Sequence, residues 1–78
     1  MNKSITVQDY LLNELRKNKI ETTVFLVNGA SLRHCIITSF DAFVIVVENQ
    51  KKQKVLYKHA ISTIEPSKKI NLAKRNDK

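Results

Sequence analysis

The sequence has little cysteine, proline or glycine and no tryptophan: one Cys, one Pro and one Gly among 78 residues. The lone Cys35 excludes an internal disulfide framework and a cysteine zinc cage, the two common supports of small secreted domains. This use of cysteine is typical of a reducing cytoplasm, which we take as the expected location. The scarcity of Gly and Pro also excludes a collagen-like or linker-like chain and is typical of a folded domain.

Long apolar runs are absent too. The longest, residues 42–47, has six residues, whereas a membrane span needs about 20. The residues after Met1 contain no apolar stretch that could act as a signal peptide. A chain of this size holds one domain, and such domains bury only roughly 60% of their unfolded surface, so we expect an oligomer.

Positive charge dominates, with 14 Lys and Arg against 7 Asp and Glu and a formal net charge of +7. Residues 1–20 carry four basic and two acidic groups, residues 21–50 one and three, and residues 51–78 nine and two. The sum of +2, −2 and +7 therefore comes mostly from the C-terminal part. Such an excess favours an anionic partner, because Lys and Arg that neutralise phosphates release condensed counterions.

Apolar residues at helical spacing, among them Val7, Leu11 and Leu15, predict a helix over about residues 7–18. Period-two patterns then predict strands at 22–27, 31–39, 43–48, 54–57 and 60–65, with breaks at 40–41 and 49–53. Asn28-Gly29 is a strong hairpin signal, and Pro66 ends the last strand. The expected fold is mainly β (α+β), a helix laid on a strongly bent five-stranded antiparallel sheet or open barrel. Its unpaired edge strands again suggest a ring or stack of subunits.

The expected domain covers residues 7–67. Residues 1–6 are expected to be a flexible N-terminus. Residues 68–78 are expected to be a short, basic, disordered tail, since most of them are charged or polar.

No arrangement typical of an enzyme or a metal site is present. The sequence lacks a Gly-x-Ser-x-Gly elbow, a phosphate-binding glycine loop and a His-Glu-x-x-His helix. A cyclising ribonuclease pair of His34 and His59 with Lys58 is disfavoured, because the two histidines are far apart in sequence. His34 and Cys35 cannot easily share a metal ion with Asp41, since neighbouring strand positions point to opposite faces. We therefore expect no catalytic residues, no metal and no cofactor.

The tight turn formed by Tyr57, Lys58 and His59 is the strongest candidate site. An imidazole beside an ammonium group supplies a flat stacking surface next to a charge that neutralises phosphate, which suits single-stranded nucleic acid. Taken alone, such a turn is more often just a solvated loop.

The run Tyr57-Lys58-His59-Ala60-Ile61-Ser62-Thr63 resembles the second signature motif of the Hfq family, the bacterial Sm-like RNA chaperones. The resemblance extends in order and spacing over about residues 7–67, through Gln8-Asp9, Leu12-Asn13, Phe25-Leu26-Val27-Asn28-Gly29, Leu32-Arg33, Ser39-Phe40-Asp41 and Phe43-Val44-Ile45. It implies a homohexameric ring of Sm folds, in which the fourth and fifth strands pair between subunits. It also implies an RNA chaperone that promotes pairing of small regulatory RNAs with messenger RNAs.

The resemblance also implies three RNA-binding surfaces. The face that takes U-rich RNA would use Gln8, Phe43, Lys58 and His59, with Phe43 stacked on a base. The face that takes A-rich RNA would use Phe25, Asn28, Gly29, Ala30, Leu32, Arg33, Gln53 and Thr63, with Phe25 and Leu32 flanking a purine. The rim of the ring would use Asn13, Arg16, Lys17, Lys19 and Phe40.

Three departures from the family pattern carry expectations of their own. His34 stands where the family usually has Gly, and the segment that follows looks one residue longer, which implies a bulge or a shifted register. Ala42 stands where Gln or Asn is common, so U-rich binding should be weaker or less selective. Ala30 replaces a larger apolar residue and removes stacking area on the A-rich face, worth about 1–3 kcal/mol per base at full strength.

Two other readings stay open. The basic helix and the lysine-rich end could lie on anionic lipid, although the helix lacks Trp or Phe on its apolar face. The chain could also be a divergent Sm-like ring protein with an altered RNA or protein partner, as Ala30 and Ala42 allow.

Overall fold

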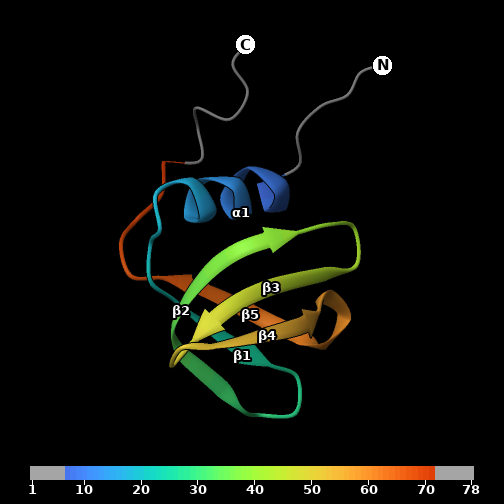
Figure 1. Cartoon of the computed structure of the whole chain (residues 1–78). Coiled ribbons are helices and arrows are strands. Elements are labelled where there is room, and N and C mark those ends of the chain that lie inside the picture. The colour runs from blue at the N-terminus through green and yellow to red at the C-terminus, as the bar shows by residue number, and fades with distance from the viewer. Residues whose placement is uncertain (1–6, 72–78) are drawn as a thin grey trace.

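The structure, a computed structural model, describes residues 7–71. Its elements are arranged as one helix followed by five strands (Figure 1): α1 (Val7–Lys17), β1 (Thr22–Leu26), β2 (Ser31–Phe40), β3 (Val44–Asn49), β4 (Lys52–Tyr57), a 3₁₀ helix η1 (Lys58–Ala60) and β5 (Ile61–Pro66). The strands form one antiparallel sheet in the order β4-β3-β2-β1-β5. The expected α+β architecture is thus confirmed.

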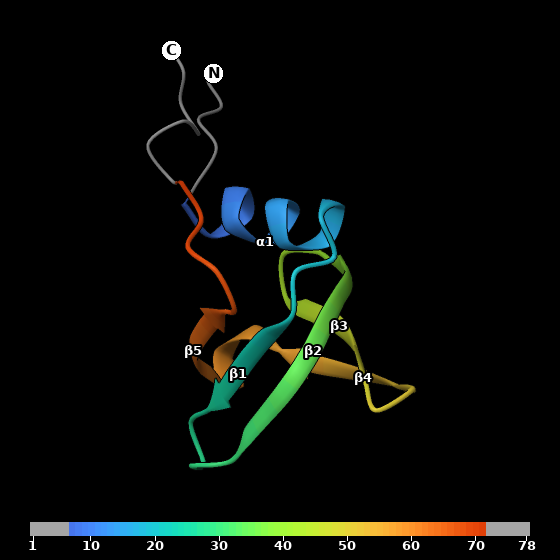
Figure 2. The ribbon, with the colours of Figure 1, turned by 90° about the vertical axis from the view of Figure 1, so that its left-hand side faces the viewer.

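The helix α1 covers one side of the bent sheet, as both views show (Figures 1 and 2). Leu12 and Leu15 are fully buried and form the core with Ile20 of the α1–β1 connection and with apolar residues of β1, β2 and β3, namely Val24, Cys35, Ile37, Ile45 and Val47. The apolar stripe of the helix is therefore used by the core.

A tight cap ends α1. Lys19 adopts a left-handed backbone conformation with φ of 50°. The N–H of Lys19 donates to the carbonyl of Arg16 (3.4 Å), and the N–H of Ile20 donates to that of Leu15 (3.1 Å). These two bonds are the Schellman pattern, which usually has Gly at the left-handed position. The buried side chains of Leu15 and Ile20 keep this end of the helix on the core.

The bulge expected near His34 is present in β2. Thr22 of β1 pairs with Cys35, whereas Val24 pairs with Leu32, so β2 has one extra residue between these pairs. His34 takes up the extra length with φ of 60°, a conformation that favours Gly. A second irregularity against β3 lies between Ile37 and Ser39. Cys35 and Ile37 both remain buried, so the inward face of the strand is preserved.

The turn between β3 and β4 corrects the break predicted at residues 49–53. β3 ends at Asn49 and β4 begins at Lys52, so only Gln50 and Lys51 connect them. Both have positive φ, 56° and 66°, as the two central residues of a type I′ hairpin require. The longer loop was expected because neither residue is Gly.

Phe40 was predicted to lie in a break between two strands, but it is the last residue of β2 and pairs with Ile45. The other element boundaries agree with the predicted ones within two residues.

At the C-terminal end, the described chain continues past the expected boundary at residue 67, and Ile70 is half-buried against the core. The expected flexible residues 1–6 and the tail residues 72–78 lie outside the described part.

The edges of the sheet are β4 and β5. On β4, Val55 and Tyr57 are 54% and 58% exposed, a large apolar area for an edge strand.

Within residues 7–71, no helix is long and apolar enough to cross a membrane. In the same range, no three His, Cys, Asp or Glu side chains gather where they could hold a metal ion.

Candidate nucleic-acid interface

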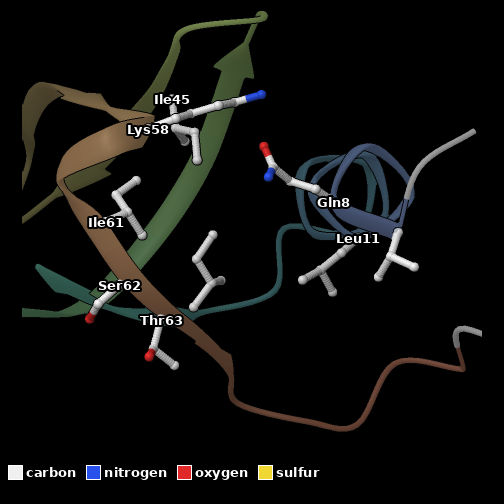
Figure 3. Close-up of a pocket in the computed structure, with 9 residues that line it drawn as sticks. Gln8, Leu11, Ile45, Lys58, Ile61, Ser62 and Thr63 are labelled. Carbon is white, nitrogen blue, oxygen red and sulfur yellow. The ribbon is translucent and has the colours of Figure 1, made fainter. Parts of the chain in front are cut away.

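A hollow of about 390 Å³ lies between the start of α1 and η1. Gln8 and Lys58, which are far apart in sequence, both line it, and their polar ends extend toward one another from opposite walls (Figure 3). Apolar side chains, including Leu11, Ile45 and Ile61, form the rest of the lining. An amide and an ammonium group above an apolar floor can hold a flat, polar-edged group such as a nucleobase.

Phe43 lies in the turn that precedes β3, and its side chain is 75% exposed. It is therefore not a core aromatic. The carboxylate of Asp41 shapes this turn, since its Oδ1 accepts the N–H of Phe43 (2.8 Å) and that of Val44 (2.9 Å). These backbone bonds, helped by the charge of Lys58, hold the pKa of Asp41 below its usual value. The N–H of Lys58 donates to the carbonyl of Phe43 (2.8 Å), so the backbones that carry the exposed ring and the lysine are joined.

The short helix η1 presents His59 to solvent. Its ring lies over that of Tyr57, with centroids 6.0 Å apart and planes 28° apart. The expected tight turn is thus a single 3₁₀ turn, which places Lys58 on the side of the hollow and His59 on the outside.

Phe40, which the resemblance assigns to the rim, also contacts this group. The Nζ atom of Lys58 is 5.8 Å from the centroid of its ring, within the usual range of a cation–π contact. The half-buried ring of Phe40 thus supports the lysine that lines the hollow.

The β1–β2 turn carries several residues assigned to the A-rich face. Gly29 has φ of 95°, and its N–H donates to the carbonyl of Leu26 (3.0 Å). Asn28 stabilises the same turn, because its Oδ1 accepts the N–H of Ala30 (3.0 Å). In both views this turn lies at the end of the molecule far from α1 (Figures 1 and 2).

The sheet register brings only some of the A-rich residues together. Phe25 pairs with Thr63 on β5 and with Ser31 on β2. Leu32 pairs with the buried Val24 and packs against the core. Because adjacent strand residues point to opposite faces, Phe25 and Leu32 of one chain do not flank the same base. Gln53 lies on β4, at the other edge of the sheet from Thr63. Arg33 is exposed at the bulge of β2.

The remaining rim residues gather at the C-terminal end of α1. The guanidinium of Arg16 donates to Oδ1 of Asn13 (2.6 Å). Lys17 makes an ion pair with Glu14 (3.3 Å), and Lys19 belongs to the helix cap. Arg16, Lys17 and Lys19 are all exposed, so their charges are available to an anionic partner.

Asn49 is a residue that the sequence reasoning missed. It is only 4% exposed. Its Nδ2 donates to the carbonyl of Arg33 (2.6 Å), and its Oδ1 accepts from Nζ of Lys54 (3.0 Å). The alternation of Ile45, Val47 and Asn49 was a usable signal, because it places the amide on the inward face of β3.

Comparisons with known proteins agree with this architecture. A family model described as "Hfq protein" matches residues 7–71. RNA-binding protein Hfq of Leptospira biflexa is 53% identical over 66 residues, which cover 85% of this chain and 78% of that protein. RNA-binding protein Hfq of Exiguobacterium sibiricum is 47% identical over 72 residues, which cover 92% and 86%.

Among solved structures, a crystal structure of "the pleiotropic translational regulator, Hfq" superposes with a TM-score of 0.74. It shares 38% sequence identity and covers 77% of this chain and 98% of its own. Sequence and structure therefore agree on one assignment, and the chain belongs to the Hfq family.

Proposed function

We propose that this protein is an RNA chaperone that binds single-stranded RNA in the cytoplasm and promotes pairing of small regulatory RNAs with messenger RNAs. Its relatives are RNA-binding proteins, and the family acts by binding RNA rather than by catalysis. The observation that carries the proposal is the convergence of Gln8 and Lys58 on one hollow, while the exposed Phe43 is joined to Lys58 by a backbone hydrogen bond. The proposed domain is the Sm-like unit of about residues 7–67, with a basic tail after it.

The hollow suits a uracil base. Lys58 can donate to a carbonyl oxygen or a phosphate, and the Gln8 amide can both donate and accept at a base edge. Phe43 offers an exposed ring for stacking, which contributes about 1–3 kcal/mol per base. His59 adds a second flat polar group on the outer side of η1. We therefore assign these four residues to the recognition of U-rich RNA.

The opposite end of the molecule suits a purine-rich strand. Phe25 and its partner Thr63 supply a ring next to a hydroxyl, and the Asn28-Gly29 turn supplies polar backbone groups. Ala30 leaves less apolar area there than a larger side chain would. We assign this surface to A-rich RNA and the basic end of α1 to RNA contacts at the rim.

A homohexameric ring would complete the A-rich surface. Gln53 on β4 and Thr63 on β5 lie at opposite edges of the sheet of one chain. Pairing of β4 with β5 of the next subunit would make these edges adjacent. It would also cover Val55 and Tyr57, which one chain leaves exposed. Two RNA strands held on one ring would meet at a raised effective concentration, which is the basis of annealing without catalysis.

The alternative of a membrane-surface protein is disfavoured. Leu12 and Leu15, the centre of the apolar stripe of α1, are fully buried. The helix thus has no free apolar face of the kind that interfacial binding requires. Liposome sedimentation should accordingly leave the protein in the supernatant.

Fluorescence anisotropy with U-rich and A-rich oligonucleotides tests the proposal. We compare the wild type with Lys58→Ala and, as a matched control, with Lys69→Ala, which removes an exposed lysine outside the assigned surfaces. Lys58→Ala should weaken U-rich binding by about tenfold or more, since a hydrogen bond from a charged group contributes about 1.5–3 kcal/mol. A-rich binding should not change.

Two outcomes would contradict the proposal. If Lys58→Ala binds U-rich RNA as tightly as the wild type at both low and high salt, the hollow is not the uracil site. If the wild type binds neither oligonucleotide, the chain is a divergent ring protein with another partner, the alternative that Ala30 and Ala42 leave open.

A further inference from the structure

Three lysines at the β3–β4 hairpin belong to none of the surfaces assigned above. Lys51 and Lys52 are exposed, and Lys54 is half-buried; we call them the hairpin lysines. The ion pairs found within residues 7–71 are Lys17–Glu14 and His34–Glu21, so no carboxylate in that range neutralises a hairpin lysine. Their positive charge is available to a partner.

The nearest acidic residue along the hairpin does not share their face. Glu48 pairs with Gln53, whereas Lys52 pairs with Asn49 and Lys54 pairs with Val47. Because side chains alternate along a strand, Lys52 and Lys54 lie on one face and Glu48 on the other. Glu48 therefore does not lie beside Lys52 and Lys54.

A buried amide holds this part of the molecule in place. Asn49 accepts from Nζ of Lys54 (3.0 Å) and donates to the carbonyl of Arg33 (2.6 Å). It thereby fixes the half-buried lysine and ties the bulge of β2, with its exposed Arg33, to the hairpin. Lys51 is held in the two-residue turn. Side chains that are already ordered lose less entropy when they bind.

We propose that the hairpin lysines bind the phosphate backbone of single-stranded RNA, as a surface separate from the base-recognition sites; this inference rests on the proposed RNA-binding function. Residues 49–54 include no aromatic side chain, so the hairpin offers charge without a stacking platform. Such contacts strengthen binding without reading sequence and depend strongly on salt.

The hairpin and η1, whose Lys58 lines the uracil hollow, lie at opposite ends of β4 (Figures 1 and 2). Lys58 is six positions after Lys52, a distance of roughly 20 Å at about 3.3 Å per strand residue. An RNA that only fills the hollow therefore leaves the hairpin lysines unused. A longer RNA has the extra nucleotides needed to reach them, which makes RNA length the decisive variable.

The test compares Lys51→Gln/Lys52→Gln with Lys68→Gln/Lys69→Gln, a control that removes the same charge from two exposed lysines outside the hairpin. We measure the affinities for hexauridylate and for a mixed-sequence RNA of about 30 nucleotides over a range of salt concentrations. Each lost phosphate contact should lower the slope of log K against log salt by about 0.7. For the longer RNA, the hairpin variant lacks two lysines in each contacted subunit, so the slope of log K against log salt should fall by about 1.4 per contacted subunit. At 0.1 M salt this corresponds to a loss in affinity of up to roughly 25-fold.

The expected result includes unchanged hexauridylate binding by the hairpin variant and a smaller effect of the control on the longer RNA. An equal loss in the two variants would overturn the inference, because net charge alone would then explain it. If the salt dependence of binding to the longer RNA is unchanged in the hairpin variant, the inference about the hairpin lysines is wrong. Binding of hexauridylate would still support the proposed function in that case. If the wild type binds no RNA, both proposals fail. Circular dichroism and gel filtration of both variants show that the fold and the assembly are retained.

Discussion

Phe43→Ala should separate RNA binding from folding. The side chain of Phe43 is 75% exposed, so its removal uncovers little apolar surface. Full burial of a Phe side chain stabilises a protein by about 1.5–3 kcal/mol, so a quarter of that, below about 1 kcal/mol, is the expected loss of stability. By contrast, replacing the fully buried Leu12 by Ala should cost about 2–5 kcal/mol.

The loss of RNA affinity should be larger than the loss of stability. A base stacked on Phe43 contributes about 1–3 kcal/mol, which corresponds to a roughly 5- to 150-fold loss in affinity for U-rich RNA. Fluorescence anisotropy gives the affinity, and urea denaturation gives the free energy of unfolding. Both should be measured at the same salt concentration, since phosphate contacts depend on salt.

Phe25→Ala is the matched control, because it removes the same ring from the other proposed face. It should weaken A-rich binding and leave U-rich binding unchanged. The reasoning is refuted if Phe43→Ala retains U-rich affinity within twofold while it remains folded. It is equally refuted if Phe25→Ala and Phe43→Ala have the same effect on both RNAs, since the two rings would then not belong to separate sites.

Three further predictions concern single side chains. Asn49→Ala leaves the carbonyl of Arg33 without its partner, so urea denaturation should show a loss of about 1–3 kcal/mol; no loss would mean that water replaces the amide. The pKa of Asp41 is held below 3.8, so its carboxylate stabilises the fold above that pH and loses this effect as the pH falls through the lowered pKa. Thermal melts of wild type and Asp41→Asn should therefore differ at pH 7 and converge below about pH 4; a constant difference would contradict this cause. Ala30→Ile should restore stacking area and tighten A-rich binding, up to about tenfold for 1.4 kcal/mol, as an oligoadenylate titration can show; unchanged affinity would show that residue 30 does not contact the base.

Most of the fold followed from local patterns in the sequence. The helix was predictable because its apolar positions recur at helical spacing and its burial depends on Leu12 and Leu15. The strands were predictable because inward positions alternate, as Ile45 and Val47 do on β3. The bulge near His34 was instead expected from the departure from the Hfq pattern at that position, where an extra residue had to be accommodated without turning Cys35 and Ile37 away from the core.

What could not be predicted depended on backbone conformations that the residue types do not favour. Gln50 and Lys51 adopt positive φ without being Gly, so local propensity suggested a longer loop. Strand pairing on both sides of the turn overrides that propensity. Lys19 behaves in the same way at the end of α1, where burial of Ile20 fixes the cap.

The candidate site likewise contains residues that could be identified from the sequence and contacts that could not. Lys58 and His59 could be singled out because the turn between two strands is short. That Phe40 supports Lys58 could not be foreseen, because this contact depends on how β2 and η1 meet in space. Asn49 was overlooked because an Asn next to a turn usually serves the turn itself, whereas here its side chain is directed inward.

A single chain supplies more of the proposed U-rich site than of the proposed A-rich site. Gln8, Lys58 and Phe43 are brought together within a single chain by α1, η1 and the turn before β3. The A-rich residues are divided between faces and edges of the sheet, since Leu32 points to the core side and Gln53 lies on β4. Pairing between subunits can bring Gln53 of one chain next to Thr63 of its neighbour. A-rich binding should therefore depend on the intact ring more strongly than U-rich binding, because loss of a neighbour removes part of the former site and leaves the hollow of the latter in place.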